Sequence, residues 1–323
     1  MCDVGVNYIQ SNFYENLMGS TPLQMPLELL KKIVDQTARY YPSAKLGFAF
    51  TEPLIYLHLD ESLQYAHANN LYTTITTNGL GLKKWAGRLH AAGLNELFLS
   101  LDGPENVHNM IRGNEHSYRL ALEGVEALVT QSNNIGISVF CVITEWNLGC
   151  LNEFLTNLNH LPLKKVGFMH MNFTTAAVAE QHNLHFGNQY PATVSNVSDV
   201  NMKALNLLQM AEEIHEIKSK SWHFPVEFSP DLDGLERLKV FYHQPEIFIG
   251  KRCMDIFNSI MIKSNGDVIP AHGRCYNIKT GNLYESNLKK IWNSSLLAQF
   301  RTTVAKNGGL LPACSRCCSS FSG

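Results

Sequence analysis

Short, mostly apolar runs recur through the first 170 residues, and turn residues close each of them. Runs of this kind are typical of buried β-strands. Five segments follow the pattern and are predicted as strands: 45–50, 72–77, 96–101, 138–144 and 165–171.

The segments between these runs carry apolar residues at three- and four-residue spacing, which predicts amphipathic helices. The predicted helices are 26–40, 60–69, 82–92, 118–130 and 151–158. Strand–helix alternation of this length indicates parallel βαβ units. Because at least five units are visible, the sequence favours an α/β fold with a full or partial barrel over an open sheet. In such a barrel, chemistry lies at the carboxyl ends of the strands.

The hydrophobic pattern changes after Phe173. Residues 174–200 are polar and predict a long loop, and residues 201–219 predict one more amphipathic helix. After about Phe224 the helical periodicity fades and a cysteine-rich region follows. The predicted organisation is therefore a barrel at residues 1–225 and a small cysteine-rich domain at residues 226–323.

Composition adds three expectations to this picture. With 45% hydrophobic and 17% charged residues, the 323-residue chain is an ordinary globular protein. Its net charge of -2 gives no support for a nucleic-acid partner. The sequence has no apolar run long enough to cross a membrane and no signal peptide at its start, so we expect a cytoplasmic protein with no membrane partner.

Cysteines gather in the last quarter of the chain, at Cys253, Cys275, Cys314 and Cys317, with Cys318 adjacent. In a reducing compartment, clustered cysteines are metal ligands or redox groups more often than disulfides. Four thiolates from two distant stretches suit either zinc or an iron–sulfur cluster. The spacing alone leaves both open.

Polar residues follow four successive predicted strands or loops. Glu52 follows the first strand, where its carboxylate suits either a hydrogen bond from a ligand ammonium or a helix N-cap. Asn78 ends the second and is typical of a turn. Ser100 and Asp102 end the third and also suit a loop cap. Arg112 lies in the next predicted loop, where it suits either a bidentate carboxylate contact or an exposed surface position.

The ordered series Thr51-Glu52-Pro53-Leu54, Thr77-Asn78-Gly79, Ser100-Leu101-Asp102-Gly103-Pro104 and Ile111-Arg112-Gly113 resembles the core of a radical S-adenosylmethionine (SAM) enzyme. The resemblance implies that Glu52 contacts the SAM amine, and that Ser100 and Arg112 contact the ribose and the carboxylate. The positions near Thr144 and 169–172 would flank the adenine or the substrate. The SAM-binding residues implied in this way are Thr51, Glu52, Asn78, Ser100, Asp102, Arg112 and Met169.

Two departures from that family's pattern stand out. Phe50 and Thr51 replace two glycines of its Gly-Gly-Glu-Pro motif, which changes the backbone approach to the ligand. Cys2 fits the third cysteine of the C-x-x-x-C-x-x-C motif that binds the SAM cluster. The first two cysteines and the first strand are missing from this sequence, so we expect a truncated partial (β/α)6 TIM-like barrel with an incomplete SAM cluster and no activity.

The C-terminal region resembles the family's SPASM or twitch domain, which binds auxiliary iron–sulfur clusters. The resemblance implies one auxiliary [4Fe-4S] cluster on Cys253, Cys275, Cys314 and Cys317, with Cys318 as an alternate ligand or a buried bystander. Ala271 stands where the family has a cysteine, and the adjacent His272 is either a ligand or a hydrogen-bonding residue.

The resemblance implies an oxidoreductase-type enzyme that cleaves SAM to a 5′-deoxyadenosyl radical and takes hydrogen from a peptide or small-molecule substrate. It also implies an electron donor such as a flavodoxin or ferredoxin. One alternative is a non-catalytic binding protein stapled by zinc at the same four cysteines. Another is a degenerate member of the family that keeps the fold without cleaving SAM.

Overall fold

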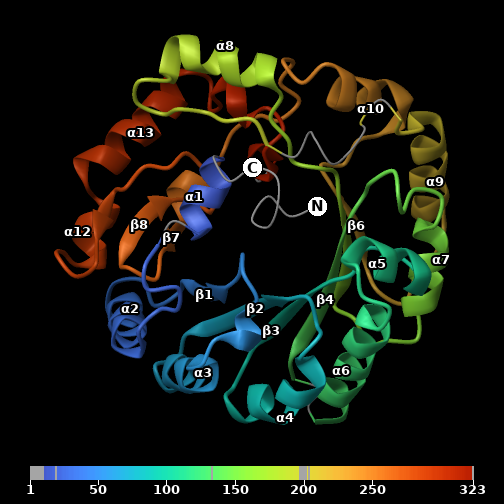
Figure 1. The fold of residues 1–323 in the computed structure, drawn as a ribbon, viewed down its shortest axis with the longest axis horizontal. Helices are drawn as coiled ribbons and strands as arrows, with labels where there is room; N and C mark the ends of the chain where they lie inside the picture. The colour runs from blue at the N-terminus through green and yellow to red at the C-terminus, as the bar shows by residue number, and fades with distance from the viewer. Residues whose placement is uncertain (1–10, 19, 132–133, 196–201, 203, 322–323) are drawn as a thin grey trace. The chain divides into compact units, whose positions relative to one another are not determined.

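The computed structural model describes residues 11–18, 20–131, 134–195, 202 and 204–321 (Figure 1). Cys2 lies outside the described residues. The chain divides into two compact units. We call Leu30–His170 with Leu205–Leu235 the sheet unit, and Met1–Leu29, Met171–Ala204 and Glu236–Gly323 together the cysteine unit. None of the helices in the described ranges is both long and apolar enough to cross a bilayer.

The sheet unit contains six parallel strands that pair in sequence order. They are β1 Lys45–Phe48, β2 Tyr72–Thr77, β3 Glu96–Ser100, β4 Gly136–Val142, β5 Lys165–Met169 and β6 Val226–Ser229. The order confirms the expected α/β fold, and it is that of an open partial barrel. Because all six strands run the same way, their carboxyl ends lie along one edge of the sheet.

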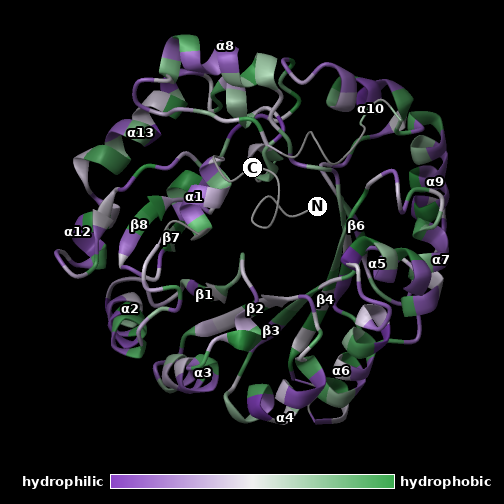
Figure 2. Ribbon diagram, viewed as in Figure 1, coloured by the Kyte–Doolittle hydropathy of each residue, from purple (hydrophilic) through white to green (hydrophobic). Residues whose placement is uncertain are grey.

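Helices cover the outer side of this curved sheet (Figure 1). They are α2 Leu27–Tyr40, α3 Leu59–Ala68, α4 Leu82–Ala91, α5 Glu105–Arg112, α6 Ser117–Gln131, α7 Leu151–Leu158 and α9 Leu207–Ser219. Hydrophobic and hydrophilic residues alternate along them in Figure 2, as amphipathic helices on a sheet require. Leu97, Val139 and Val166 of the central strands are fully buried, and Cys141 is fully buried beside them, as expected for core packing.

The cysteine unit contains a small antiparallel sheet of β7 Ile260–Ile262, β8 Asp267–Pro270 and β9 Gly281–Asn282. An Asn265-Gly266 turn joins β7 to β8, with Gly266 at a φ of 83° that favours glycine. The remaining elements of this unit are α1 Asn12–Met18, α8 Ala176–Phe186, α10 Gly234–His243, α11 Asp255–Asn258, α12 Leu288–Trp292, α13 Ser295–Lys306 and the 3₁₀ turns η2 Pro312–Cys314 and η3 Cys318–Phe321.

Several local predictions were wrong. Residues 174–200 were expected as a loop, yet α8 begins there after Thr175, whose side chain accepts a hydrogen bond from the Val178 amide. The apolar residues of α8 do not lie on one face, so the sequence shows no helical periodicity there. Arg112 was expected in a loop but ends α5.

Candidate functional site

Glu52 joins the end of β1 to the end of β2. Its carboxylate caps the 3₁₀ turn η1 Pro53–Ile55 by accepting from the Leu54 amide at 3.1 Å. It also accepts from the Asn78 amide at 2.9 Å and from the Thr77 hydroxyl at 2.6 Å. A carboxylate offers about four lone-pair sites. The capping alternative is therefore realised, and one acceptor site remains for a ligand ammonium.

Phe50 occupies the place where the family pattern has glycine. Its φ of 73° lies in the left-handed region that glycine adopts without strain. The backbone before Glu52 thus keeps a glycine-like conformation although the residue carries a side chain, which is 38% exposed.

Asp102 and Arg112 form a buried contact just beyond β3. The Arg112 Nε donates to the Asp102 carboxylate, whose side chain is 3% exposed, while that of Arg112 is 32% exposed. Burial raises the pKa of Asp102, and the Arg112 charge opposes this rise. In the described part of the chain, the terminal amino groups of Arg112 have no protein partner. Asp102 therefore orients a guanidinium whose outer edge is available to a carboxylate.

His108 and Asn147 hold the backbone of Asp102. The Asp102 amide donates to His108 Nδ1 at 3.0 Å, and its carbonyl accepts from Asn147 Nδ2 at 2.8 Å. Burial lowers the pKa of His108 to about 4, with Arg112 adding to the effect. His108 is therefore neutral at pH 7, and its 3.7 Å approach to the Asp102 carboxylate is not an ion pair.

The remaining residues predicted to contact SAM lie along the carboxyl edge of the sheet or near it. Ser100 ends β3 and Met169 ends β5, so both lie at the carboxyl edge of the sheet. Thr144 is buried and donates its amide to Asn147 at 2.8 Å. Thr51 is exposed. A hydrogen bond thus joins Glu52 to the Asn78 amide, whereas Ser100 and Met169 share only the carboxyl edge of the sheet.

In the cysteine unit, the four predicted ligands line one cavity. Cys253, Cys275, Cys314 and Cys317 all contribute to the lining of one pocket. Cys253 lies just before α11, Cys275 follows β8, and the other two bracket the C-x-x-C loop after η2. All the cysteines in the described residues are free thiols.

These thiols lie close enough to raise one another's pKa. Burial raises the pKa of Cys253 to about 11, and the neighbouring Cys314 adds to the rise. Burial, followed by Cys314 and Cys253, raises the pKa of Cys275. A cation or metal cluster in the cavity removes this repulsion, because coordinated thiols are deprotonated. The donor set fits a thiolate-bound metal group.

Cys317 and Cys318 differ in their surroundings. Cys317 donates a hydrogen bond to Cys318, which raises the pKa of Cys317, as do burial and the charges of Cys318 and Cys314. The pKa of Cys318 is lowered, mainly by its hydrogen bond to Cys317. Burial opposes this change, and the neighbouring His272 adds to it. Only Cys317 of the two lines the cavity. This favours Cys317 over Cys318 as the fourth thiolate.

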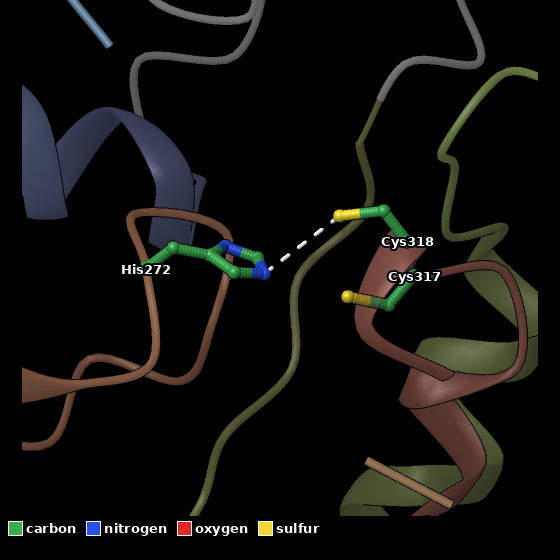
Figure 3. Close-up of side chains that lie close together, drawn as sticks. All are labelled: His272, Cys317 and Cys318. Carbon is green, nitrogen blue, oxygen red and sulfur yellow. Dashed lines mark hydrogen bonds between the residues drawn. The ribbon is translucent and has the colours of Figure 1, made fainter. Parts of the chain in front are cut away.

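His272 faces both of these thiols (Figure 3). Its Nε2 and the two sulfurs lie within 4.8 Å of one another, and Nε2 is 3.8 Å from the sulfur of Cys318. Its Nδ1 accepts from the Arg274 amide at 3.1 Å, so Nε2 carries the proton and donates to the Ser319 hydroxyl at 2.7 Å. A protonated nitrogen has no lone pair for a metal. This geometry suits the hydrogen-bonding role of His272.

The spacing of the thiols also bears on the identity of the metal. Four thiolates on one zinc ion lie about 3.8 Å apart, given tetrahedral bonds of about 2.3 Å. Among the residues that the structure describes, the group of ligands within 4.8 Å of one another is His272, Cys317 and Cys318. No three of the sulfurs of Cys253, Cys275, Cys314 and Cys317 all lie within 4.8 Å of one another in this part of the chain.

Comparison with known proteins gives two family matches. The sequence model of the Radical SAM superfamily matches residues 2–156, and that of SPASM, an iron–sulfur cluster-binding domain, matches residues 253–318. The second match begins at Cys253 and ends at Cys318.

Curated relatives match part of the chain. GTP 3′,8-cyclase of Helicobacter pylori (strain ATCC 700392 / 26695) is 27% identical over 162 residues, which are 49% of this chain and 48% of the cyclase. GTP 3′,8-cyclase of Mycolicibacterium smegmatis is 33% identical over 109 residues, 33% of this chain and 30% of the cyclase. The match thus spans about half or less of these relatives.

Solved structures share the fold over most of the chain. Native anSMEcpe with bound AdoMet has a TM-score of 0.59 and 17% identity, and the match covers 85% of this chain and 74% of that one. Streptococcus suis SuiB bound to precursor peptide SuiA has a TM-score of 0.59 and 16% identity, with 95% and 68% covered.

Proposed function

Because the chain belongs to the radical SAM superfamily and carries a SPASM iron–sulfur domain, we propose that its sheet unit binds SAM and that its cysteine unit holds one auxiliary [4Fe-4S] cluster. The protein is an enzyme whose cofactors are SAM and [4Fe-4S] clusters. The observation that carries the proposal is the coexistence in one chain of the strand-end set around Glu52 and Arg112 and of four thiols lining one cavity.

The strand-end residues are assigned the following roles. Glu52 accepts from the SAM ammonium with its remaining lone pair, and Arg112 binds the SAM carboxylate with its outer edge. Asp102 acts through Arg112 by fixing the guanidinium. Thr51, Asn78, Ser100 and Met169 complete the site along the same edge, and Cys2 is the third ligand of the SAM-binding cluster.

When bound, the SAM-binding cluster supplies one electron that divides SAM into methionine and a 5′-deoxyadenosyl radical able to abstract a hydrogen atom. An external donor of the flavodoxin or ferredoxin class supplies that electron. The proposed substrate is a peptide, supported by the similarity in fold to the peptide-bound SuiB. A small molecule is the alternative, supported by the partial similarity to GTP 3′,8-cyclase. A cytoplasmic location accords with the free thiols.

The test compares iron and acid-labile sulfide in anaerobically purified wild-type protein and two single variants, Cys275→Ala and Cys314→Ala. We expect each variant to lose the C-terminal cluster, because each removes one of its four ligands. Cys150→Ser is the control, since Cys150 lies before α7 in the sheet unit. Wild-type protein with zinc in place of iron, or variants with unchanged iron, would overturn the proposal.

A further inference from the structure

Tyr276 lies directly after Cys275 and reaches a different predicted ligand. Its hydroxyl is 3.3 Å from the sulfur of Cys314, and the residue as a whole is 6% exposed. The tyrosine is therefore a buried polar group whose hydroxyl contacts a sulfur at the proposed cluster site.

The direction of this hydrogen bond follows from the chemistry of the ligand. In the free thiol form, either atom can donate. A cysteine that binds iron has lost its proton, and a phenol keeps its proton at neutral pH. With Cys314 on the cluster, the Tyr276 hydroxyl is thus the donor.

Neighbouring rings hold Tyr276 in this position. His182 stacks on it with ring centroids 5.0 Å apart and planes 16° apart, and Phe300 meets it edge-on at 5.8 Å. His182 is fixed in turn, because its Nε2 is 2.7 Å from the Tyr190 carbonyl and its Nδ1 accepts from the Ala313 amide at 3.4 Å. One histidine therefore steadies both the tyrosine ring and the backbone next to Cys314.

We infer that Tyr276 donates a hydrogen bond to the Cys314 sulfur and thereby raises the reduction potential of the auxiliary cluster. The inference rests on the proposed assignment of Cys314 as a cluster ligand. Reduction adds negative charge to the cluster and its sulfurs. A donor aimed at a ligating sulfur stabilises the reduced form more than the oxidised form, and such hydrogen bonds are among the factors that set iron–sulfur potentials.

The experiment compares Tyr276→Phe with Tyr190→Phe. Tyr190 is a matched control because it is 5% exposed, belongs to the same aromatic group, and its hydroxyl is 3.5 Å from Thr303 rather than near a sulfur. All proteins carry Cys2→Ser, so that the signal reports the C-terminal cluster. Midpoint potentials are measured by redox titration followed by electron paramagnetic resonance.

For Tyr276→Phe we expect full iron and sulfide content and a reduction equilibrium about tenfold less favourable, a shift of about 59 mV to more negative potential. We expect Tyr190→Phe to match the parent. An unchanged potential in a fully loaded Tyr276→Phe protein overturns the inference. Loss of the cluster in Tyr276→Phe but not in Tyr190→Phe also overturns the inference, because the tyrosine would then be needed to hold the cluster. Unchanged iron in Cys314→Ala overturns instead the ligand assignment beneath it.

Discussion

Glu52 serves three donors at once, and its position explains why a single carboxylate can link two strands and still face a ligand. The Thr77 hydroxyl and the Asn78 amide come from the end of β2, and the Leu54 amide comes from the turn after β1. These bonds fix both oxygens before any ligand arrives. A fixed acceptor loses little entropy when it binds an ammonium, which is the advantage of a preorganised site.

We predict that Glu52→Gln weakens SAM binding about tenfold or more. The amide keeps the size of the side chain but removes the charge, and a hydrogen bond to a charged group contributes about 1.5–3 kcal/mol. Isothermal titration of the loaded protein with SAM measures the change. Glu123→Gln is the control, because Glu123 is a partly exposed carboxylate paired with Lys83 and Arg119. Equal dissociation constants for Glu52→Gln and wild type would refute the assigned role.

Residue types at the site could be predicted from the sequence, but their partners could not. The spacing of Glu52 and Arg112 relative to the strands marked both as candidates. Nothing in the sequence indicated that Arg112 contacts Asp102, because that contact depends on a helix whose existence was not predicted. Likewise, the C-x-x-C spacing predicted Cys317 but could not place Cys318 outside the cavity.

At the scale of elements, α5 determines the geometry around Asp102. His108 and Arg112 are four residues apart on this helix, so both lie on one face and reach the same aspartate. Five of the six parallel strands were predictable because buried parallel strands are short apolar runs, whereas β6 was not predicted. Eight-residue α5 was not, since most of its residues are polar and the Asp102-Gly103-Pro104 turn suggested a loop.

Because His108 is buried, we expect the stability of the folded protein to depend on pH. Its pKa is about 4 when folded, against an ordinary value of 6.5, so the unfolded chain takes up the proton first as the pH falls. Stability is therefore complete above about pH 6.5 and decreases down to about pH 4. The full difference is of order 3 kcal/mol.

Urea midpoints measured from pH 7.5 to 4 test this expectation. His108→Asn keeps an acceptor for the Asp102 amide but has no titrating ring, so its midpoint should fall less steeply than that of wild type. His58→Asn is the control, because the side chain of His58 is 43% exposed and pairs with Glu61. Parallel curves for wild type and His108→Asn would contradict the prediction.

At the scale of the whole molecule, the cysteine unit is assembled from three separate stretches of chain, and its ligands are distant in sequence. Within the last of these stretches, Arg316 connects the C-x-x-C loop to α10. It is 1% exposed and donates to the carbonyls of Val240, Phe241, Gln244 and Ile247 at the end of α10. Its side chain thus satisfies orphan carbonyls of a helix terminus and anchors the loop that carries Cys314 and Cys317.

We predict that Arg316→Met lowers the iron content and speeds loss of the C-terminal cluster to a chelator, because unsatisfied buried carbonyls cost about 1–3 kcal/mol each and the loop loses its anchor. Arg316→Lys should give an intermediate result, since one ammonium cannot reach every carbonyl that the guanidinium contacts. Arg301→Met is the control: Arg301 donates to the Ile256 and Trp292 carbonyls in the same unit but lies outside the loop.

Iron content and chelator release rates equal to wild type in Arg316→Met would show that the loop is positioned without this arginine. Equal losses in Arg316→Met and Arg301→Met would point to general destabilisation of the unit. Because metal binding and local folding are coupled in such domains, the effect on cluster retention should exceed that on the sheet unit, which urea unfolding of the sheet unit can check separately.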